Sequence, residues 1–320
     1  MSGLPAWTRR LVGPVVLIVL ILALDPTEVL ARLSSIHLGW AGLAVLIGIA
    51  QTFLSAWRWR YTAGRLGLDL PFVSALAEYY LAVFLNQVLP GGVLGDATRA
   101  WRHASRSGFG SSDAGSAMRA VLLERASGQL VMVFVALAST CVILWRMNSS
   151  MLLPVGAVGV LSALAAVMTA RRLTSARPAA APSSLVPRIL RDARLALWDG
   201  SAIVVQVATS TLIVGTYVLT YLIAARAVGV EVPFVELAPL VAPVLLAMLI
   251  PLSVAGWGLR EGAAAAVWVA VGMSAAEGVA ISMAYGAIVL IGTLPGAWLF
   301  VASGYEPSAR GSARRRVLRK

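Results

Sequence analysis

Long apolar segments separated by short basic stretches constrain this 320-residue chain more than any other feature. Hydrophobic residues make up 59% of the chain and charged residues only 12%, whereas a soluble domain usually carries about 25% charged residues. Several apolar segments approach or exceed the roughly 17–25 residues that a membrane-spanning helix needs. The sequence therefore predicts an all-α polytopic membrane protein, because a spanning helix satisfies its backbone polar groups internally.

The net charge of +12 could indicate nucleic-acid binding, but the distribution of the charge indicates membrane topology instead. Basic residues gather at 9–10, 58–65 and 171–194, and in the C-terminal tail. Such clusters beside spans mark the cytoplasmic side of a membrane protein. We therefore expect no nucleic-acid partner, both termini in the cytoplasm, and a basic, disordered tail over residues 303–320.

One motif occurs twice, each time directly after a long apolar segment. The first copy begins at Pro90 (PGGVLGDATR) and the second at Pro251 (PLSVAGWGLRE), about half a chain later. In both copies a glycine follows the proline by five residues and an arginine follows it by nine. Polar, helix-breaking backbone at membrane depth is tolerated only where it is buried or lines a cavity, so the pair points to a transport site.

Each copy of the motif would stop a helix, turn the chain and begin another helix. Proline ends or kinks a helix because it lacks an amide hydrogen, and glycine permits positive φ and close backbone approach. The new helix then presents free amides and the positive end of its dipole to an anion. Arg99 and Arg260 would add permanent positive charge, and a planar guanidinium suits phosphate because it bonds two oxygens.

Charged side chains at membrane depth need partners. We expect the carboxylates Asp96, Glu124 and Glu261 to be the partners of the motif arginines. Asp96 and Arg99 share a helix face at a spacing of three residues, so we expect them to pair. Arg260 and Glu261 are adjacent and would point about 100° apart on a helix, so we expect each of them to pair elsewhere.

The apolar and basic segments together predict six full spans and two re-entrant helical hairpins. If each motif turns back within the membrane, every basic cluster stays in the cytoplasm, including Arg99–Arg106. The second half of the chain is then inverted relative to the first, as pseudo-repeats of about 10–148 and 149–302 within a single domain of 1–302. The alternative is eight full spans, which would place Arg99–Arg106 outside. The predicted spans are 11–24, 39–57, 128–145, 152–168, 201–225 and 279–301, the hairpins begin with 72–89 and 234–250, an amphipathic segment covers 114–127, and a flexible loop covers 169–187.

The sequence predicts neither a metal nor a cofactor. His37 and His103 lie far apart, and neither has cysteines or carboxylates at ligand spacing. A phosphate-binding loop of the Gly-x-x-x-x-Gly-Lys-Ser/Thr type is also absent from the sequence. Transport would therefore be facilitated or coupled to an ion.

Three segments together resemble the flippase-like integral membrane family, also called the lysylphosphatidylglycerol synthase transmembrane region. They are Asn86–Arg99 (NQVLPGGVLGDATR), Leu123–Gly128 (LERASG) and Pro251–Glu261. The resemblance covers roughly residues 10–302. It implies a stand-alone member in the bacterial inner (cytoplasmic) membrane, without the aminoacyl-transfer domain that makes lysylphosphatidylglycerol, and so without synthase activity.

The resemblance implies that the protein moves a membrane lipid with an anionic headgroup, either a phospholipid or a polyprenyl-linked phosphate. Two alternatives stay open. One is a non-transporting partner of envelope-biosynthesis enzymes; the other is an enzyme that modifies a lipid headgroup, although no Ser-His, Cys-His or metal grouping supports catalysis. The candidate substrate-binding residues are Asn86, Pro90, Gly92, Gly95, Asp96, Arg99, Glu124, Arg125, Pro251, Gly256, Arg260 and Glu261.

Overall fold

The computed structural model describes residue 15 and residues 26–89, 92–106, 111–175, 185–249 and 253–302. Every regular element within these residues is a helix, as the composition predicts. The tail over 303–320, the two motif prolines and, apart from Val15, the predicted first span lie outside the described residues. The helices are α2 (Pro26–Ser34), α3 (Leu38–Arg65), α4 (Phe72–Val88), α5 (Leu94–Arg106), α6 (Ser111–Arg146), α7 (Leu152–Ser175), α8 (Leu185–Ala193), a π-helical turn η1 (Arg194–Trp198), α9 (Ala202–Ala227), α10 (Phe234–Leu246), a 3₁₀ turn η2 (Ala247–Leu249), α11 (Leu259–Ala270), α12 (Ala275–Gly292) and α13 (Leu294–Ala302).

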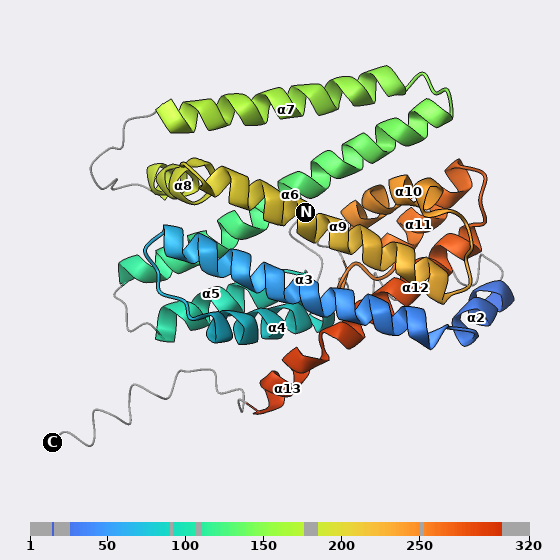
Figure 1. Ribbon diagram of the computed structural model, residues 1–320, viewed down its shortest axis with the longest axis horizontal. Coiled ribbons are helices and arrows are strands. Elements are labelled where there is room, and N and C mark those ends of the chain that lie inside the picture. The colour runs from blue at the N-terminus through green and yellow to red at the C-terminus, as the bar shows by residue number, and fades with distance from the viewer. Residues whose placement is uncertain are drawn as a thin grey trace.

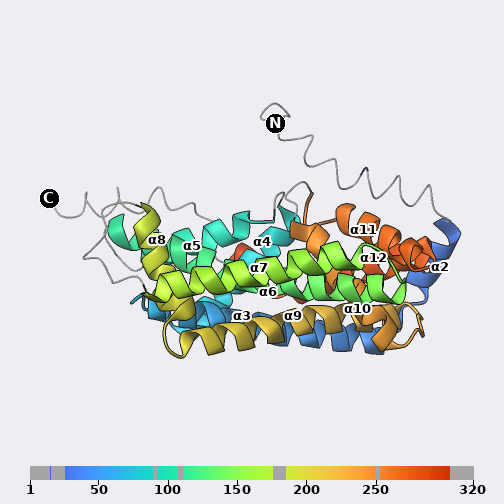
Figure 2. The ribbon, with the colours of Figure 1, turned by 90° about the horizontal axis from the view of Figure 1, so that it is seen from above.

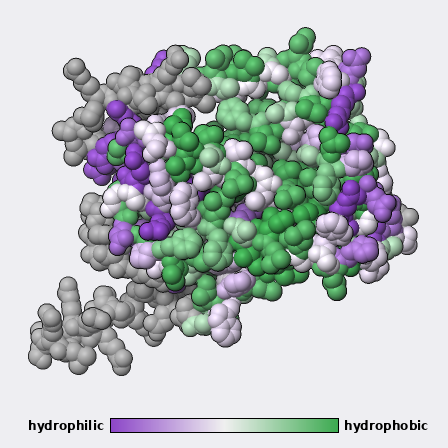
Figure 3. All heavy atoms as spheres, in the orientation of Figure 1, coloured by the Kyte–Doolittle hydropathy of each residue, from purple (hydrophilic) through white to green (hydrophobic). Residues whose placement is uncertain are grey.

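Four helical segments of the described chain are long and apolar enough to cross a membrane. They are Leu38–Arg65, Gly115–Arg146, Ala202–Ala227 and Ala275–Ala302, the last of which joins α12 and α13. Hydrophobic side chains cover the middle of the face seen in Figure 3, and hydrophilic side chains gather toward both ends of the long helices. The protein is therefore a multi-pass, all-α membrane protein, because such a band matches a bilayer core between two aqueous surfaces.

Helices α3 and α9 run antiparallel, side by side, through the centre of the molecule (Figure 1). At one end, the backbone amide of His37 donates to the carbonyl of Ala227 at 2.9 Å. Toward the other end, Gln206 Nε2 donates to Thr62 Oγ1 at 2.8 Å. The long helix α6 packs against both of them, and also contacts α5 and α10.

Two pairs of shorter helices lie at opposite ends of this central group (Figures 1 and 2). Helices α4 and α5 pack on each other at one end, and α10 and α11 pack on each other at the other end. Each pair is joined by one copy of the motif. The final helix α13 crosses over to pack on α4, where Gly296 approaches so closely that an added Cβ would overlap the Tyr80 carbonyl oxygen.

A second repeated segment, which the sequence prediction missed, precedes each pair of short helices. It reads GLDLPFV over 67–73 and GVEVPFV over 229–235. The first glycine of each copy has φ +76°, and Pro71 and Pro233 stand at the N-caps of α4 and α10 with φ, ψ of −56°, 139° and −55°, 139°. The same local sequence therefore turns the chain in the same way after α3 and after α9.

The structure corrects several predicted boundaries. The segment 114–127 and the span 128–145 form one continuous helix, α6, because alanine, leucine and arginine in the first part favour helix. The predicted loop over 169–187 is wrong at both ends, since α7 continues to Ser175 and α8 begins at Leu185. The predicted last span is divided after Gly292, where α12 ends and α13 begins in the sequence TLPG.

Candidate functional site

A cavity of about 290 Å³ lies between the central helices and the two hairpins. Gly92, Asp96 and Arg99 of the first motif line it, and so do Ser253 and Gly256 of the second motif. Walls from α3, α4, α6, α9 and α12 complete the cavity. The fold thus brings the two copies of the motif, far apart in sequence, to one internal space.

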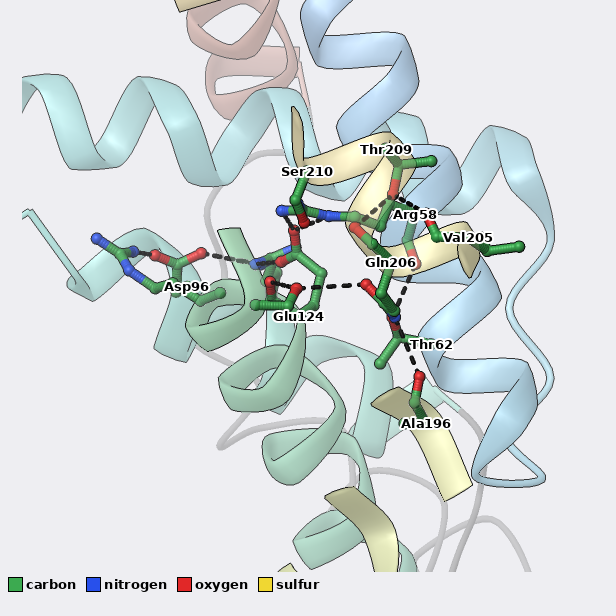
Figure 4. A network of polar contacts seen from close by, with 12 residues as sticks. Arg58, Thr62, Asp96, Glu124, Ala196, Val205, Gln206, Thr209 and Ser210 are labelled. Carbon is green, nitrogen blue, oxygen red and sulfur yellow. Dashed lines mark hydrogen bonds and ion pairs between the residues drawn. The ribbon is translucent and has the colours of Figure 1, made fainter. Parts of the chain in front are cut away.

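Three charged side chains from three helices meet at the wall of this cavity. Glu124 of α6 accepts from Arg58 Nε of α3 at 3.1 Å, and its second oxygen accepts from Arg99 Nη2 of α5 at 2.7 Å. Arg58 Nη1 also donates to Ser210 Oγ of α9 at 2.8 Å, as Figure 4 shows for Arg58, Glu124 and Ser210. All three charged residues are buried, and mutual pairing is what makes such charges tolerable at membrane depth.

The sequence prediction missed the part of this network that α3 and α9 contribute. Gln206 donates to Thr62 Oγ1 and, at 3.2 Å, to the Ala196 carbonyl (Figure 4). The charge pattern places Arg58 in a cytoplasmic cluster of basic residues, whereas the structure buries its side chain. A signal was available, because Arg58 and Thr62 on α3 are spaced four residues apart, like Gln206 and Ser210 on α9, and so mark one polar face.

Asp96 connects the remaining charged groups of the cavity. Its Oδ1 accepts from Arg99 Nε at 3.0 Å, which confirms the predicted pairing. Its Oδ2 accepts from Asn86 Nδ2 at 3.0 Å and also pairs with the guanidinium of Arg125. Arg125 in turn donates to the Gly92 carbonyl at 2.9 Å. Candidates from α4, α5 and α6 are thus joined in one cluster that lines the cavity.

The two motif glycines lie where the chain packs too closely for a side chain. A Cβ added at Gly95 would overlap the carbonyl oxygen of Ala82 on α4. Gly256 has φ +82°, and a Cβ there would lie 2.7 Å from Met248 Cγ. Both positions agree with the expected roles of glycine, close approach at Gly95 and positive φ at Gly256.

Substitution of Gly95 by alanine is therefore expected to destabilise the protein by about 1–3 kcal/mol, because backbone rather than a flexible side chain would have to move. Thermal unfolding of the purified protein in detergent measures this effect. Gly64→Ala is the matched control, since Gly64 lies in the last turn of α3 and a Cβ there meets nothing within 4 Å. Equal melting temperatures for the two variants would contradict the close packing of α4 on α5.

Arg260 and Glu261 do not line the cavity. They pair with each other, with Arg260 Nη2 at 2.6 Å from Glu261 Oε1, and both reach Ser282 Oγ, at 2.8 and 2.9 Å. The expectation that each would pair elsewhere is wrong. Glu261 turns back toward the start of α11, where its Oε2 accepts from the Gly258 amide at 2.6 Å, and the long arginine side chain can follow it.

In each hairpin, a side chain already accepts a hydrogen bond from a backbone amide at the start of the second helix, α5 or α11. Glu261 Oε2 accepts from the Gly258 amide at the start of α11. Asn86 Oδ1 accepts from the Gly95 amide at the start of α5, at 2.8 Å. The first turn of a helix is where free amides and the dipole would attract an anion. The arginines of the first hairpin, rather than the helix ends, therefore offer positive charge to the cavity.

Three buried donors that line the cavity have no hydrogen-bond partner among the described residues. They are Arg99 Nη1, Thr220 Oγ1 and Ser253 Oγ, each on a residue only 2% exposed. The guanidinium of Arg99 lies over the rings of Trp59 and Tyr79, 4.7 and 4.5 Å from their centres. Buried donors are nearly always satisfied in native proteins, so this trio marks a place where a ligand can bond.

Residues 10–296 match the family described as lysylphosphatidylglycerol synthase TM region. No curated protein and no solved structure matches the chain significantly. The matched region contains both hairpins, the cavity between them and all twelve candidate residues. This match covers most of residues 10–302, the range over which the sequence motifs resemble the family. The chain therefore belongs to the lysylphosphatidylglycerol synthase TM region family.

Proposed function

We propose that this protein is a translocase of the inner (cytoplasmic) membrane that moves a lipid with an anionic headgroup from one leaflet to the other. The observation that carries the proposal is the unpartnered Arg99 Nη1, a buried cationic donor in the wall of a cavity between two membrane hairpins. Guanidinium groups bind phosphate oxygens well because several of their donors lie in one plane.

The size of the cavity supports entry of the headgroup alone. A volume of about 290 Å³ is just below the range for pockets that hold drug-sized ligands, roughly 300–1,000 Å³. The phosphate would bond to Arg99 and Arg125, and the hydrocarbon tails would stay in the bilayer. No chemical step on the lipid is part of the proposal.

We further propose that the two halves form an inverted repeat of three spans and one re-entrant hairpin each. The antiparallel pair α3 and α9, the hairpins at opposite ends and the repeated segments 67–73 and 229–235 support this arrangement. Rocking of one half against the other around a fixed site is a common means of alternating access in transporters. The six spans and cytoplasmic termini predicted from the charges fit the same scheme.

Labelling of single cysteines from each side of the membrane tests this topology. In a Cys141→Ser background, we expect Trp101→Cys on α5 to react only from the cytoplasm and Val269→Cys on α11 to react only from the opposite side. Both positions are exposed in the structure, at 54% and 61%. Reaction of Trp101→Cys only from outside would support eight full spans and contradict the re-entrant hairpin.

Transport is tested with the purified protein in liposomes that contain a fluorescent anionic phospholipid. A membrane-impermeant quencher then reports how much of the probe has reached the inner leaflet. We expect movement without ATP at a rate that rises with the amount of protein. A rate equal to that of protein-free liposomes would contradict the proposed function and would favour a non-transporting role.

A further inference from the structure

We propose that the cavity accepts a phosphodiester headgroup with one negative charge, joined to a neutral group that carries hydroxyls, such as glycerol, inositol or a sugar. This inference rests on the proposed function and specifies its substrate. It is based on three features of the cavity lining: its net charge, its buried donors without partners among the described residues, and its uncharged polar side chains.

The charged groups of the lining leave one positive charge unbalanced. Three arginines line the cavity, Arg58, Arg99 and Arg125, and two carboxylates, Asp96 and Glu124. The neighbouring pair of Arg260 and Glu261 lies outside the lining and is neutral as a unit.

A net charge buried at membrane depth is costly unless a counter-charge accompanies it. A phosphodiester carries one negative charge and would neutralise the cavity. A phosphomonoester carries up to two and would leave an excess of negative charge, whereas a zwitterionic headgroup would leave the positive charge unbalanced. Charge balance therefore selects a phosphodiester whose attached group is neutral.

Both carboxylates of the lining are already occupied, which argues against a cationic headgroup. Glu124 accepts from Arg58 and Arg99, and Asp96 accepts from Arg99 and Asn86 and pairs with Arg125. An ammonium group in the cavity would have to compete with these guanidinium groups for the same oxygens. It would also add to a charge that is already positive.

The uncharged polar lining suits a headgroup that carries hydroxyls. Thr220 Oγ1 of α9 and Ser253 Oγ of the second motif are buried without a partner among the described residues. The same lining also contains carboxamides, and a carboxamide both donates and accepts hydrogen bonds, as a hydroxyl does. These carboxamides are Gln51, Asn86, Gln87 and Gln129.

Native mass spectrometry of the purified full-length chain with lipids of identical acyl chains tests the charge preference. The probes are phosphatidylglycerol, phosphatidylethanolamine, phosphatidic acid and lysylphosphatidylglycerol. We expect phosphatidylglycerol to bind at least about 10-fold more tightly than the other three, because its headgroup balances the single positive charge of the lining and theirs do not. Equal binding of the zwitterionic or the cationic lipid would overturn the inference.

Two substitutions should shift the preference in opposite directions. Asp96→Asn adds one positive charge to the lining, so phosphatidic acid should gain about 10-fold relative to phosphatidylglycerol. Arg125→Gln makes the lining neutral, so phosphatidylethanolamine should gain instead. The matched control is the double change Glu78→Gln and Arg102→Gln, which removes a neutral ion pair outside the cavity and should leave the order of preference unchanged.

The hydroxyl preference has its own test. Phosphatidylmethanol has the same charge as phosphatidylglycerol but lacks the headgroup hydroxyls, and it should bind about 3- to 10-fold more weakly to the wild-type protein. The double change Thr220→Val and Ser253→Ala should remove that difference. No difference in the wild-type protein would contradict the proposed hydroxyl contacts.

The outcomes separate this inference from the proposed function. If lipids cross the bilayer but the Asp96→Asn and Arg125→Gln variants keep the wild-type order of lipid preference, the inference from charge is wrong. The proposed translocase function would still stand. If no lipid crosses and none binds preferentially, both fail. A melting temperature in detergent close to that of the wild type ensures that a changed preference reflects the cavity.

Discussion

Replacement of Arg99 by glutamine is expected to slow protein-dependent lipid transport by about 10- to 100-fold, with little loss of folded protein. The change removes the unpartnered cationic donor of the cavity lining, and a hydrogen bond to a charged group is worth about 1.5–3 kcal/mol. The fold should survive because Glu124 would still pair with Arg58, and Asp96 would still pair with Arg125. The fluorescent-lipid assay in liposomes measures the rate, and thermal unfolding in detergent measures the stability.

The two motif arginines should behave differently. Arg260 lies in a closed pair with Glu261 and Ser282 outside the cavity, so Arg260→Gln should lower the melting temperature and reduce transport only in proportion to the protein lost. The double change Glu78→Gln and Arg102→Gln is the matched control for Arg99, since Arg102 lies one turn further along α5. Unaltered transport by a folded Arg99→Gln variant would refute the proposed site.

Replacement of Glu124 by glutamine is expected to destabilise the protein by about 3–5 kcal/mol, the usual cost of leaving a buried charge without its partner. Glu124 bonds Arg58 and Arg99, and all three side chains are at most 5% exposed. Loss of the negative charge would leave Arg58 with neutral acceptors only, the Ser210 hydroxyl and the amide oxygen of the introduced glutamine. Thermal unfolding in detergent at fixed lipid content measures the loss.

A compensating change provides the control. The double variant Arg58→Gln and Glu124→Gln removes one charge of each sign and should be more stable than Glu124→Gln alone. Together with the Arg58→Gln single variant and the wild type, the two complete a double-mutant cycle that measures the coupling of the pair, because residues in direct contact are not additive. A double variant less stable than either single variant would show that side-chain packing, rather than charge, dominates this position.

Much of the helical architecture could be predicted from the sequence, because apolar length and basic flanks are local signals. The segments 201–225 and 72–89 correspond closely to α9 and α4, whereas α3 continues to Arg65, beyond the predicted end of its span at Trp57. Continuity between neighbouring helices was harder to predict. Residues 114–127 carry charges that look like an interface, yet they continue straight into the next span because their charged partners lie on other helices.

The candidate site was predicted in part, and the reason lies in how its residues pair. Asp96 and Arg99 share one turn of a helix, so their pairing could be inferred from spacing. The bond between Arg58 and Glu124 joins residues 66 positions apart, and no local pattern indicates which buried helix faces meet. Arg260 and Arg99 occupy equivalent places in the two copies of the motif, but their tertiary environments differ. Arg99 lines the cavity, whereas Arg260 is paired with Glu261 outside it.

The packing of α13 on α4 has a consequence for how the chain is assembled. Gly296 lies against the backbone of Tyr80, so the first hairpin receives part of its cover from the last helix of the described chain. During synthesis α4 is made long before α13, so the face of α4 that α13 covers lacks this cover until α13 is made. Burial of this face of α4 is therefore a late step in the assembly of the fold.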